Sequence, residues 1–338
     1  MRTTIYRTAS AIIITAFCCY PQTTIKFASL APTGSPYDNG IRAIAADWEK
    51  ISGGKVRMII YSGSIAGDED DMIRKMKIGQ LQAAGITGVG LCRLVKDIIT
   101  IQLPMLVRTD AELQYIMEKM APEFQTELEA KGLRVLAWMP VGWVHYFARK
   151  PVASPDQLKK MKLFVWAGDA DGVLAWKEMG FHPIPLAATD IFASLQSGMI
   201  DAFSAPPLTA ASYQWFTIAN NMCDLTWAPL IGGIVVTTAA WKKLPADLRP
   251  RLEKAVQDRV KAMNREILQA DRQAIEAMKK NGLIINAVSP DNERQWKKLA
   301  DEGLAKTEGK SFQAKYRALI TNYLEEFRAS RQTGTAAP

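Results

Sequence analysis

The residue patterns that could support catalysis or nucleotide binding are incomplete in this chain. The glycines of residues 85–90 (GITGVG) have the reverse of the dinucleotide-binding spacing, so they lack the order needed to hold a pyrophosphate. In residues 303–311 (GLAKTEGKS), five residues separate the first glycine from the Gly-Lys-Ser end, whereas a phosphate-binding P-loop has four between these points. No GxSxG nucleophile motif is present. The sequence therefore predicts a protein that is not an enzyme and uses no cofactor.

Patterns for metal binding are equally sparse. The chain has 2 histidines, His145 and His182, and no CxxC pair, so a histidine or zinc site is not expected. Residues 68–71 (DEDD) lack the alternating ligands and the central glycine of a calcium loop. They are better explained as the first turn of a helix, where carboxylates complement the helix dipole. We expect no metal site.

The strongest pattern lies in residues 158–215, which alternate expected strands and helices. Parallel sheets of this βαβαβ kind bind ligands at the carboxyl ends of their strands. Two of these ends are Phe164-Val165-Trp166 and Phe203-Ser204-Ala205, which are mostly apolar. The sequence therefore predicts a largely apolar binding cleft. The expected strands are 162–166, 181–184 and 199–204, and the expected helices are 169–179 and 189–196.

The first part of the chain repeats this plan, which predicts two similar α/β lobes that face each other. Residues 79–84 (GQLQAA) match residues 198–203 (GMIDAF), and each segment leads from a helix into a strand. An apolar stripe over residues 245–281 predicts a helix about 55 Å long, which exceeds one small lobe and should run across both. Strands are expected at 24–29, 55–61, 82–87, 134–138 and 143–149, and helices from 35, from 67–71 and over 111–131.

The N-terminus and the charge distribution bear on location and partners. Residues 1–22 contain two early arginines, an apolar run of about nine residues and then Cys18-Cys19, which is typical of a signal peptide or lipoprotein leader and too short to span a bilayer. We expect export to the periplasm, with lipid attachment at Cys18 or Cys19 as an alternative to ordinary cleavage. The net charge is +8, but the basic residues are dispersed, so no nucleic-acid partner is expected.

Three stretches together resemble the substrate-binding proteins of tripartite ATP-independent periplasmic (TRAP) transporters, the DctP-like family. They are residues 25–83, 158–207 and 235–256, and the likeness extends over roughly residues 24–328. The resemblance implies a two-lobed, hinge-linked periplasmic-binding-protein-like fold of type II-like α/β class, with a long bracing helix. It also implies that the protein delivers a small-molecule ligand to membrane permease subunits and catalyses no reaction.

The corresponding domain boundaries follow from the expected elements and from this resemblance. Residues 1–22 form the leader and 329–338 a disordered tail. Lobe I takes residues 23–141 plus 230–269, and lobe II takes 142–229 plus 270–328.

The chain departs from this family where similar proteins bind their ligand. The family strand LKGxKxRV carries an arginine that forms a bidentate salt bridge with the ligand carboxylate, and here Phe164 takes its place. Residues 143–146 (WVHY) likewise replace another cation near the hinge. We therefore expect an apolar or lipid-like ligand. The expected lining is Phe164, Trp166, Trp143, Tyr146 and Phe203, with Ser204 and Thr87 as polar anchors.

Alternatives to this interpretation stay open at the level of sequence. An ordinary organic-acid binder could carry a relocated cation, for which Arg149 and Arg93 are candidates. A lipoprotein scaffold whose cleft is filled by side chains is the alternative from a different class. With its apolar pocket, the chain also resembles the lineage of TRAP binding proteins that work beside a tetratricopeptide-repeat lipoprotein. This resemblance implies such a lipoprotein as a partner in addition to the permease.

Overall fold

The computed structural model describes residues 22–332. The predicted leader of residues 1–22 lies outside the described residues apart from Gln22, and so do Cys18 and Cys19, the candidates for lipid attachment. Within the described range, no helix combines the length and the apolar character needed to cross a membrane. Cys92 and Cys223 are both free thiols.

The first sheet contains the βαβαβ unit that the sequence predicts. Its parallel strands pair in the order β2-β1-β3. Ser35 caps the first helix by accepting a hydrogen bond from the Asp38 amide, and Pro36 stands in the first turn, where its missing N–H costs nothing. The elements are β1 (Thr23–Ser29), α1 (Pro36–Ile51), β2 (Val56–Tyr61), α2 (Glu69–Lys77) and β3 (Ala83–Thr87).

The second sheet repeats this arrangement, with parallel strands in the order β7-β5-β6. Two short strands, β8 and β10, pair with each other in parallel, and β8 also pairs with the end of the long strand that joins the two sheets. The predicted pair of similar α/β lobes is therefore confirmed, and we call them the first and the second lobe after their sheets. The elements are β5 (Lys162–Trp166), α6 (Ala170–Glu178), β6 (His182–Leu186), α7 (Ile191–Gln196), β7 (Ala202–Ala205), β8 (Asn221–Cys223) and β10 (Ile284–Asn286).

One long strand, β4 (Leu133–Ala148), joins the two sheets. The sequence predicts two strands in this region, at 134–138 and 143–149, but the structure makes them continuous because the intervening residues pair with β9 (Ala228–Thr237). Leu133–Val144 pairs with β9, and His145–Ala148 pairs with β7. The connection between the lobes is therefore a hydrogen-bonded ribbon rather than a loop.

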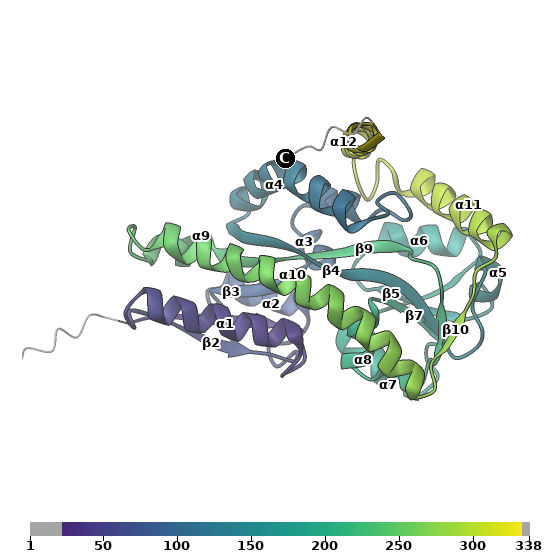
Figure 1. The fold of residues 1–338 in the computed structure, drawn as a ribbon, viewed down its shortest axis with the longest axis horizontal. Coiled ribbons are helices and arrows are strands. Elements are labelled where there is room, and N and C mark those ends of the chain that lie inside the picture. The colour runs from purple at the N-terminus through teal and green to yellow at the C-terminus, as the bar shows by residue number, and fades with distance from the viewer. Residues whose placement is uncertain (1–21, 333–338) are drawn as a thin grey trace, which may run out of the picture.

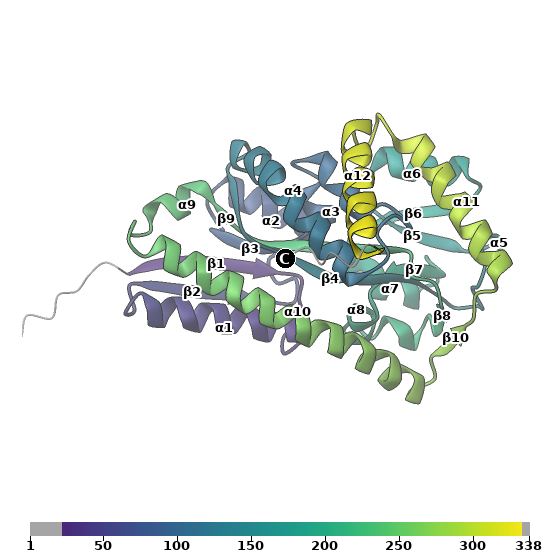
Figure 2. The same ribbon diagram turned by 45° about the horizontal axis from the view of Figure 1, so that its top comes forward.

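Helix α10 (Arg249–Lys280) braces both lobes, as the sequence predicts. Its 32 residues span about 48 Å, and Figures 1 and 2 show it running across the molecule from the side of α1 to the side of β10. The Trp48 indole N–H of α1 donates to the Leu252 carbonyl at 3.1 Å, which ties the helix to the first lobe. Met278 at the other end packs into the core of the second lobe.

The C-terminal helices pack on different lobes. The sequence predicts that residues 270–328 belong to lobe II, and α11 (Pro290–Thr307) packs on α6 and α5. However, α12 (Ala314–Gln332) packs on α4 (Asp110–Ala130) of the first lobe and buries Tyr316, Ile320 and Leu324 there. The spacing of these residues predicts an amphipathic helix but does not identify its partner. Since α12 continues to Gln332, the predicted disordered tail from 329 is wrong for residues 329–332, and residues 333–338 lie outside the described range.

Short helices complete the chain. They are α3 (Gly88–Leu91), α5 (Pro155–Leu158), α8 (Pro207–Ser212) and α9 (Thr238–Lys243), with 3-10 helices η1 (Lys96–Gln102), η2 (Ala188–Asp190) and η3 (Trp215–Thr217).

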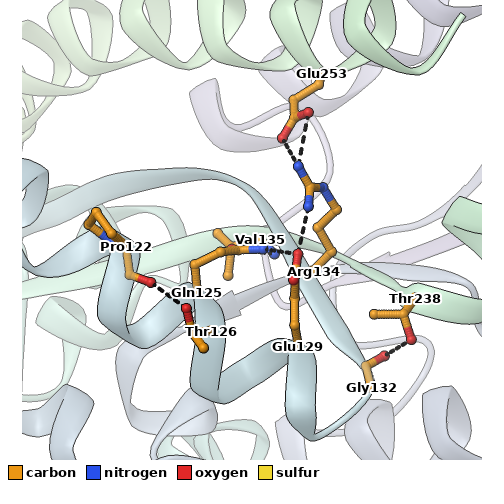
Figure 3. Close-up of polar contacts among 9 residues, drawn as sticks. All are labelled: Pro122, Gln125, Thr126, Glu129, Gly132, Arg134, Val135, Thr238 and Glu253. Carbon is orange, nitrogen blue, oxygen red and sulfur yellow. Dashed lines mark hydrogen bonds and ion pairs between the residues drawn. The ribbon is translucent and has the colours of Figure 1, made fainter. Parts of the chain in front are cut away.

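Arg134 connects three elements of the first lobe. From β4 its guanidinium donates to Glu253 of α10 at 2.9 and 3.2 Å and to Glu129 at the end of α4 at 2.6 Å, as Figure 3 shows. The Arg134 side chain is 30% exposed and that of Glu253 is 22% exposed, so the pair is partly shielded from water. Such charge-assisted, partly buried contacts are stronger than an exposed ion pair.

We expect Arg134→Gln to lower the free energy of unfolding by about 1–2 kcal/mol, because both carboxylates lose a charged donor. Urea denaturation followed by far-UV circular dichroism measures this change. Lys254→Gln is the matched control, because Lys254 pairs with Asp258 on the surface, where their side chains are 72% and 56% exposed. We expect this variant to lose less than about 0.5 kcal/mol of unfolding free energy. Equal losses in the two variants would show that the position of Arg134 between α4 and α10 adds no stability.

Candidate ligand-binding site

A cavity of about 160 Å3 lies between the lobes, and we call it the inner cavity. The residues at the carboxyl ends of parallel strands from both sheets line it: Ser29 of β1, Thr87 of β3, Trp166 of β5 and Ser204 of β7. This is the place where an open α/β sheet is expected to bind a ligand.

Four of the predicted lining residues meet in the inner cavity: Thr87, Phe164, Trp166 and Ser204. The Phe164 side chain is 2% exposed. Its ring lies edge-on to that of Trp166, with the ring centroids 5.4 Å apart and the planes at 67°. The two rings form an apolar wall at the position where similar proteins are expected to carry a cation.

A larger cavity of about 510 Å3 also adjoins this wall, and we call it the outer cavity. Phe164, Trp166 and Ser204 line both cavities, and the predicted residue Tyr146 lines the outer one. The remaining lining comes mainly from α6, α11 and the segment around η1, and it includes both apolar and charged side chains.

Two of the predicted residues, Trp143 and Phe203, line neither cavity. Successive side chains of a strand point to opposite faces, so Ser204 faces the cavities while Phe203 is fully buried and stacks on Phe147 at 5.0 Å. The Trp143 indole donates to Asp110 at 2.7 Å and packs against the core of the first lobe. The strand ends predicted from the sequence do line the cavities, but the sequence did not assign the face of each residue.

The polar group that sequence reasoning missed is Glu69. The sequence pattern indicates only an acidic first helical turn at this position, yet Glu69 lines the inner cavity and is 4% exposed. Its carboxylate accepts hydrogen bonds from the Thr87 amide at 2.5 Å and the Thr87 hydroxyl at 2.8 Å. Burial raises the pKa of Glu69 to about 7, against the lowering effect of these hydrogen bonds. Its spacing from Met72 and Ile73 places it on the buried face of α2, which is the signal that could have revealed it.

The charge of the inner cavity distinguishes it from a carboxylate site. Among residues 22–332, no lysine, arginine or histidine lines it, and Glu69 is its ionisable carboxyl group. The Ser29 hydroxyl, 3% exposed, also lines it and has no hydrogen-bond partner within the described part of the chain. The cavity is therefore suited to an apolar group that carries a small polar substituent.

The structure separates the two candidates for a relocated cation. Arg149 lines neither cavity, and its guanidinium donates to the Leu195 carbonyl. Arg93, which lies between α3 and η1, lines the outer cavity. Its Nε donates to Asp70 at 3.1 Å, and its Nη2 donates across the cleft to the Ala167 carbonyl.

Further polar contacts also cross between the lobes. The Ala188 amide donates to Asp68 at 3.4 Å, and the Tyr213 hydroxyl donates to the Leu30 carbonyl. The lobes are thus in contact around the cavities. Two α/β lobes joined by a continuous ribbon and closed over a cavity at their strand ends define a solute-binding protein.

Comparison with known proteins gives the family. The family model DctP, described as bacterial extracellular solute-binding protein, family 7, matches residues 27–310. The chain therefore belongs to the DctP family of bacterial extracellular solute-binding proteins, as its sequence stretches predict. Members of this family bind solutes and are not enzymes, so the expectation of a binding protein without catalysis is confirmed.

Individual relatives share the family at low identity. The chain is 25% identical over 252 residues to a solute-binding protein of Chromohalobacter salexigens, covering 73% of this chain and 75% of that one. It is 24% identical over 263 residues to the C4-dicarboxylate-binding periplasmic protein DctP of Rhodobacter capsulatus, covering 76% and 78%. A TRAP periplasmic solute-binding protein of Shewanella oneidensis with bound succinate has the same fold, with a TM-score of 0.84, 17% identity and coverage of 90% and 99%. A TRAP periplasmic solute-binding protein of Pseudomonas putida F1 with bound D-glucuronate also has this fold. Its TM-score is 0.79, its identity is 23%, and the match covers 90% of this chain and 97% of that one.

Proposed function

We propose that this TRAP-type solute-binding protein captures a largely apolar ligand, or the apolar part of a ligand, in its inner cavity and delivers it to a membrane permease. The observation that carries the proposal is that Phe164 and Trp166 form the wall while no basic side chain among residues 22–332 lines this cavity. A carboxylate placed there would lose its hydration without gaining a cation, and Glu69 would add repulsion whenever it is ionised.

The size of the cavity limits what it can take. An apolar cavity of about 150 Å3 is known to accept benzene, so about 160 Å3 accommodates roughly one ring or a short branched alkyl group. Burial of apolar surface, worth about 25 cal/mol per Å2, then supplies most of the binding free energy. The Ser29 hydroxyl and Glu69 are placed to hydrogen-bond one polar substituent on this group.

Ligand capture also requires the lobes to open and close. We propose boundaries near 141/142 and 229/230, where β4 and β9 pass from one sheet toward the other. Lobe I includes α12 in this proposal, because α12 packs on α4. The permease and the tetratricopeptide-repeat lipoprotein expected as partners stay predictions.

Mass spectrometry of small molecules released by denaturing the purified protein tests the ligand class. We expect an enriched species with an apolar ring or alkyl group, and we expect succinate and D-glucuronate to raise the melting temperature by less than about 1 °C, because their carboxylates find no cation in the inner cavity. If either acid raises the melting temperature by several degrees and no apolar species is enriched, the proposal is wrong.

A second candidate function is the binding of a small organic acid by Arg93 in the outer cavity. The position of the Arg93 guanidinium beside that cavity favours it, and the solved relatives with bound succinate and D-glucuronate give it general support. The thermal-shift comparison above separates it from the first proposal.

A further inference from the structure

The inner and outer cavities adjoin each other and share part of their lining. Val144, Phe164, Trp166, Ser204 and Leu230 line both of them. With volumes of about 160 and 510 Å3, the inner cavity holds one ring-sized group, and the outer cavity has room for a much longer group.

The two cavities differ in charge. The inner cavity has no basic lining residue among residues 22–332, whereas Arg93 and Lys96 line the outer cavity together with Asp169 and Asp171. Lys96 is exposed, while the Arg93 side chain is only 21% exposed. Arg93 is therefore the cation whose charge is least screened by water near the cavities.

The surroundings of Arg93 fix its guanidinium next to the apolar wall. The Ala167 carbonyl that it contacts belongs to the residue directly after Trp166. Gly168 follows with φ +84°, and a Cβ at that position would come within 2.8 Å of the Arg93 Cζ atom. A glycine is thus needed both for this backbone conformation and for the close approach of the guanidinium. With Nε and Nη2 engaged, the Nη1 amino group has no hydrogen-bond partner within the described part of the chain.

We propose that the natural ligand is an elongated amphipathic acid. Its apolar end occupies the inner cavity, its body passes the wall of Phe164 and Trp166, and its anionic end binds the free Nη1 side of Arg93 in the outer cavity. This inference rests on the proposed function, since it uses the inner cavity for the apolar end. It adds that the ligand is charged at the far end and that Arg93 determines this specificity.

Isothermal titration calorimetry with a series of phenyl-substituted acids tests the inference, using protein that has been unfolded, stripped of small molecules and refolded. The probes are benzoate, phenylacetate, 3-phenylpropionate, 4-phenylbutyrate and 6-phenylhexanoate, with 4-phenylbutyramide and 6-phenylhexanamide as neutral partners. We expect the affinity to increase with the length of the spacer until the carboxylate reaches Arg93. At that length the acid should bind at least about tenfold more tightly than its amide.

Variants then assign the anionic end. Arg93→Gln should weaken the preferred acid by about tenfold and leave its amide within about twofold. Gly168→Ala should have the same selective effect, because the new Cβ displaces the guanidinium, and it serves as a second test if Arg93→Gln folds poorly. Arg74→Gln is the control, since Arg74 is 68% exposed and lines neither cavity.

The outcomes separate this inference from the proposed function. If acids and amides bind equally, or if Arg93→Gln weakens both equally, the inner cavity still binds apolar groups but the anionic end is not at Arg93, and the inference is wrong. If no member of the series binds to the wild-type protein, the proposed use of the inner cavity fails as well.

Discussion

Replacing Phe164 by arginine should turn the apolar wall into a carboxylate site and strongly destabilise the ligand-free protein. Phe164 is 2% exposed, so the new guanidinium would be buried without a matched partner. Uncompensated buried charges of this kind cost about 3–5 kcal/mol, of which ionised Glu69 in the same cavity can offset a part. We expect a loss of about 3 kcal/mol or more in the free energy of unfolding, measured by urea denaturation at pH 8.

Addition of succinate should reverse much of this loss, because a carboxylate pairs with the new cation. At a hundredfold excess over the dissociation constant, a ligand adds about 2.7 kcal/mol of stability, which appears as a rise of several degrees in melting temperature. Phe164→Leu is the matched control: it removes part of the ring but adds no charge, so it should lose about 1–2 kcal/mol and gain no response to succinate. A Phe164→Arg protein that folds but ignores succinate would show that this wall does not contact the ligand.

Glu69 gives the second large effect, a dependence of stability on pH. The folded protein holds the Glu69 proton with a pKa of about 7, whereas the ordinary value of 4.5 applies to the unfolded chain. The folded state therefore binds more protons between these values, and the free energy of unfolding falls as the pH rises from about 4.5 to 7 and then levels off. The difference of about 2.5 pKa units corresponds to about 3 kcal/mol.

Urea denaturation at pH values from 5 to 8 measures this slope, and Glu69→Gln is the matched control. The glutamine is neutral at every pH and retains one oxygen to accept a hydrogen bond from Thr87. The difference between wild type and variant isolates Glu69 from other titrating groups, such as Asp271, whose pKa burial raises to about 6. Parallel pH profiles in the two proteins would show that Glu69 is already ionised in the folded state.

Much of the fold could be predicted from the sequence because the signals are local. The apolar spacing of α1 and α10 and the short runs of β1, β2 and β5 are set within a few residues, and the structure places these elements close to the predicted bounds. The segments of β4 were also detected, but their union depends on pairing with β9, nearly a hundred residues later in the chain. No local pattern reports such a long-range pairing.

The candidate site shows the same division. By itself, the sequence determined the family, the two α/β lobes, and the presence of Phe164 at the position of the expected cation, since residue identities at strand ends are read directly. Only the tertiary structure decided that Ser204 rather than Phe203 faces the cavity, that Glu69 is buried beside it, and that Arg93 crosses to Ala167 of the other lobe. The physical reason is that the face, the burial and the charge environment of a side chain depend on segments far away in the sequence, which meet only when the two lobes pack together.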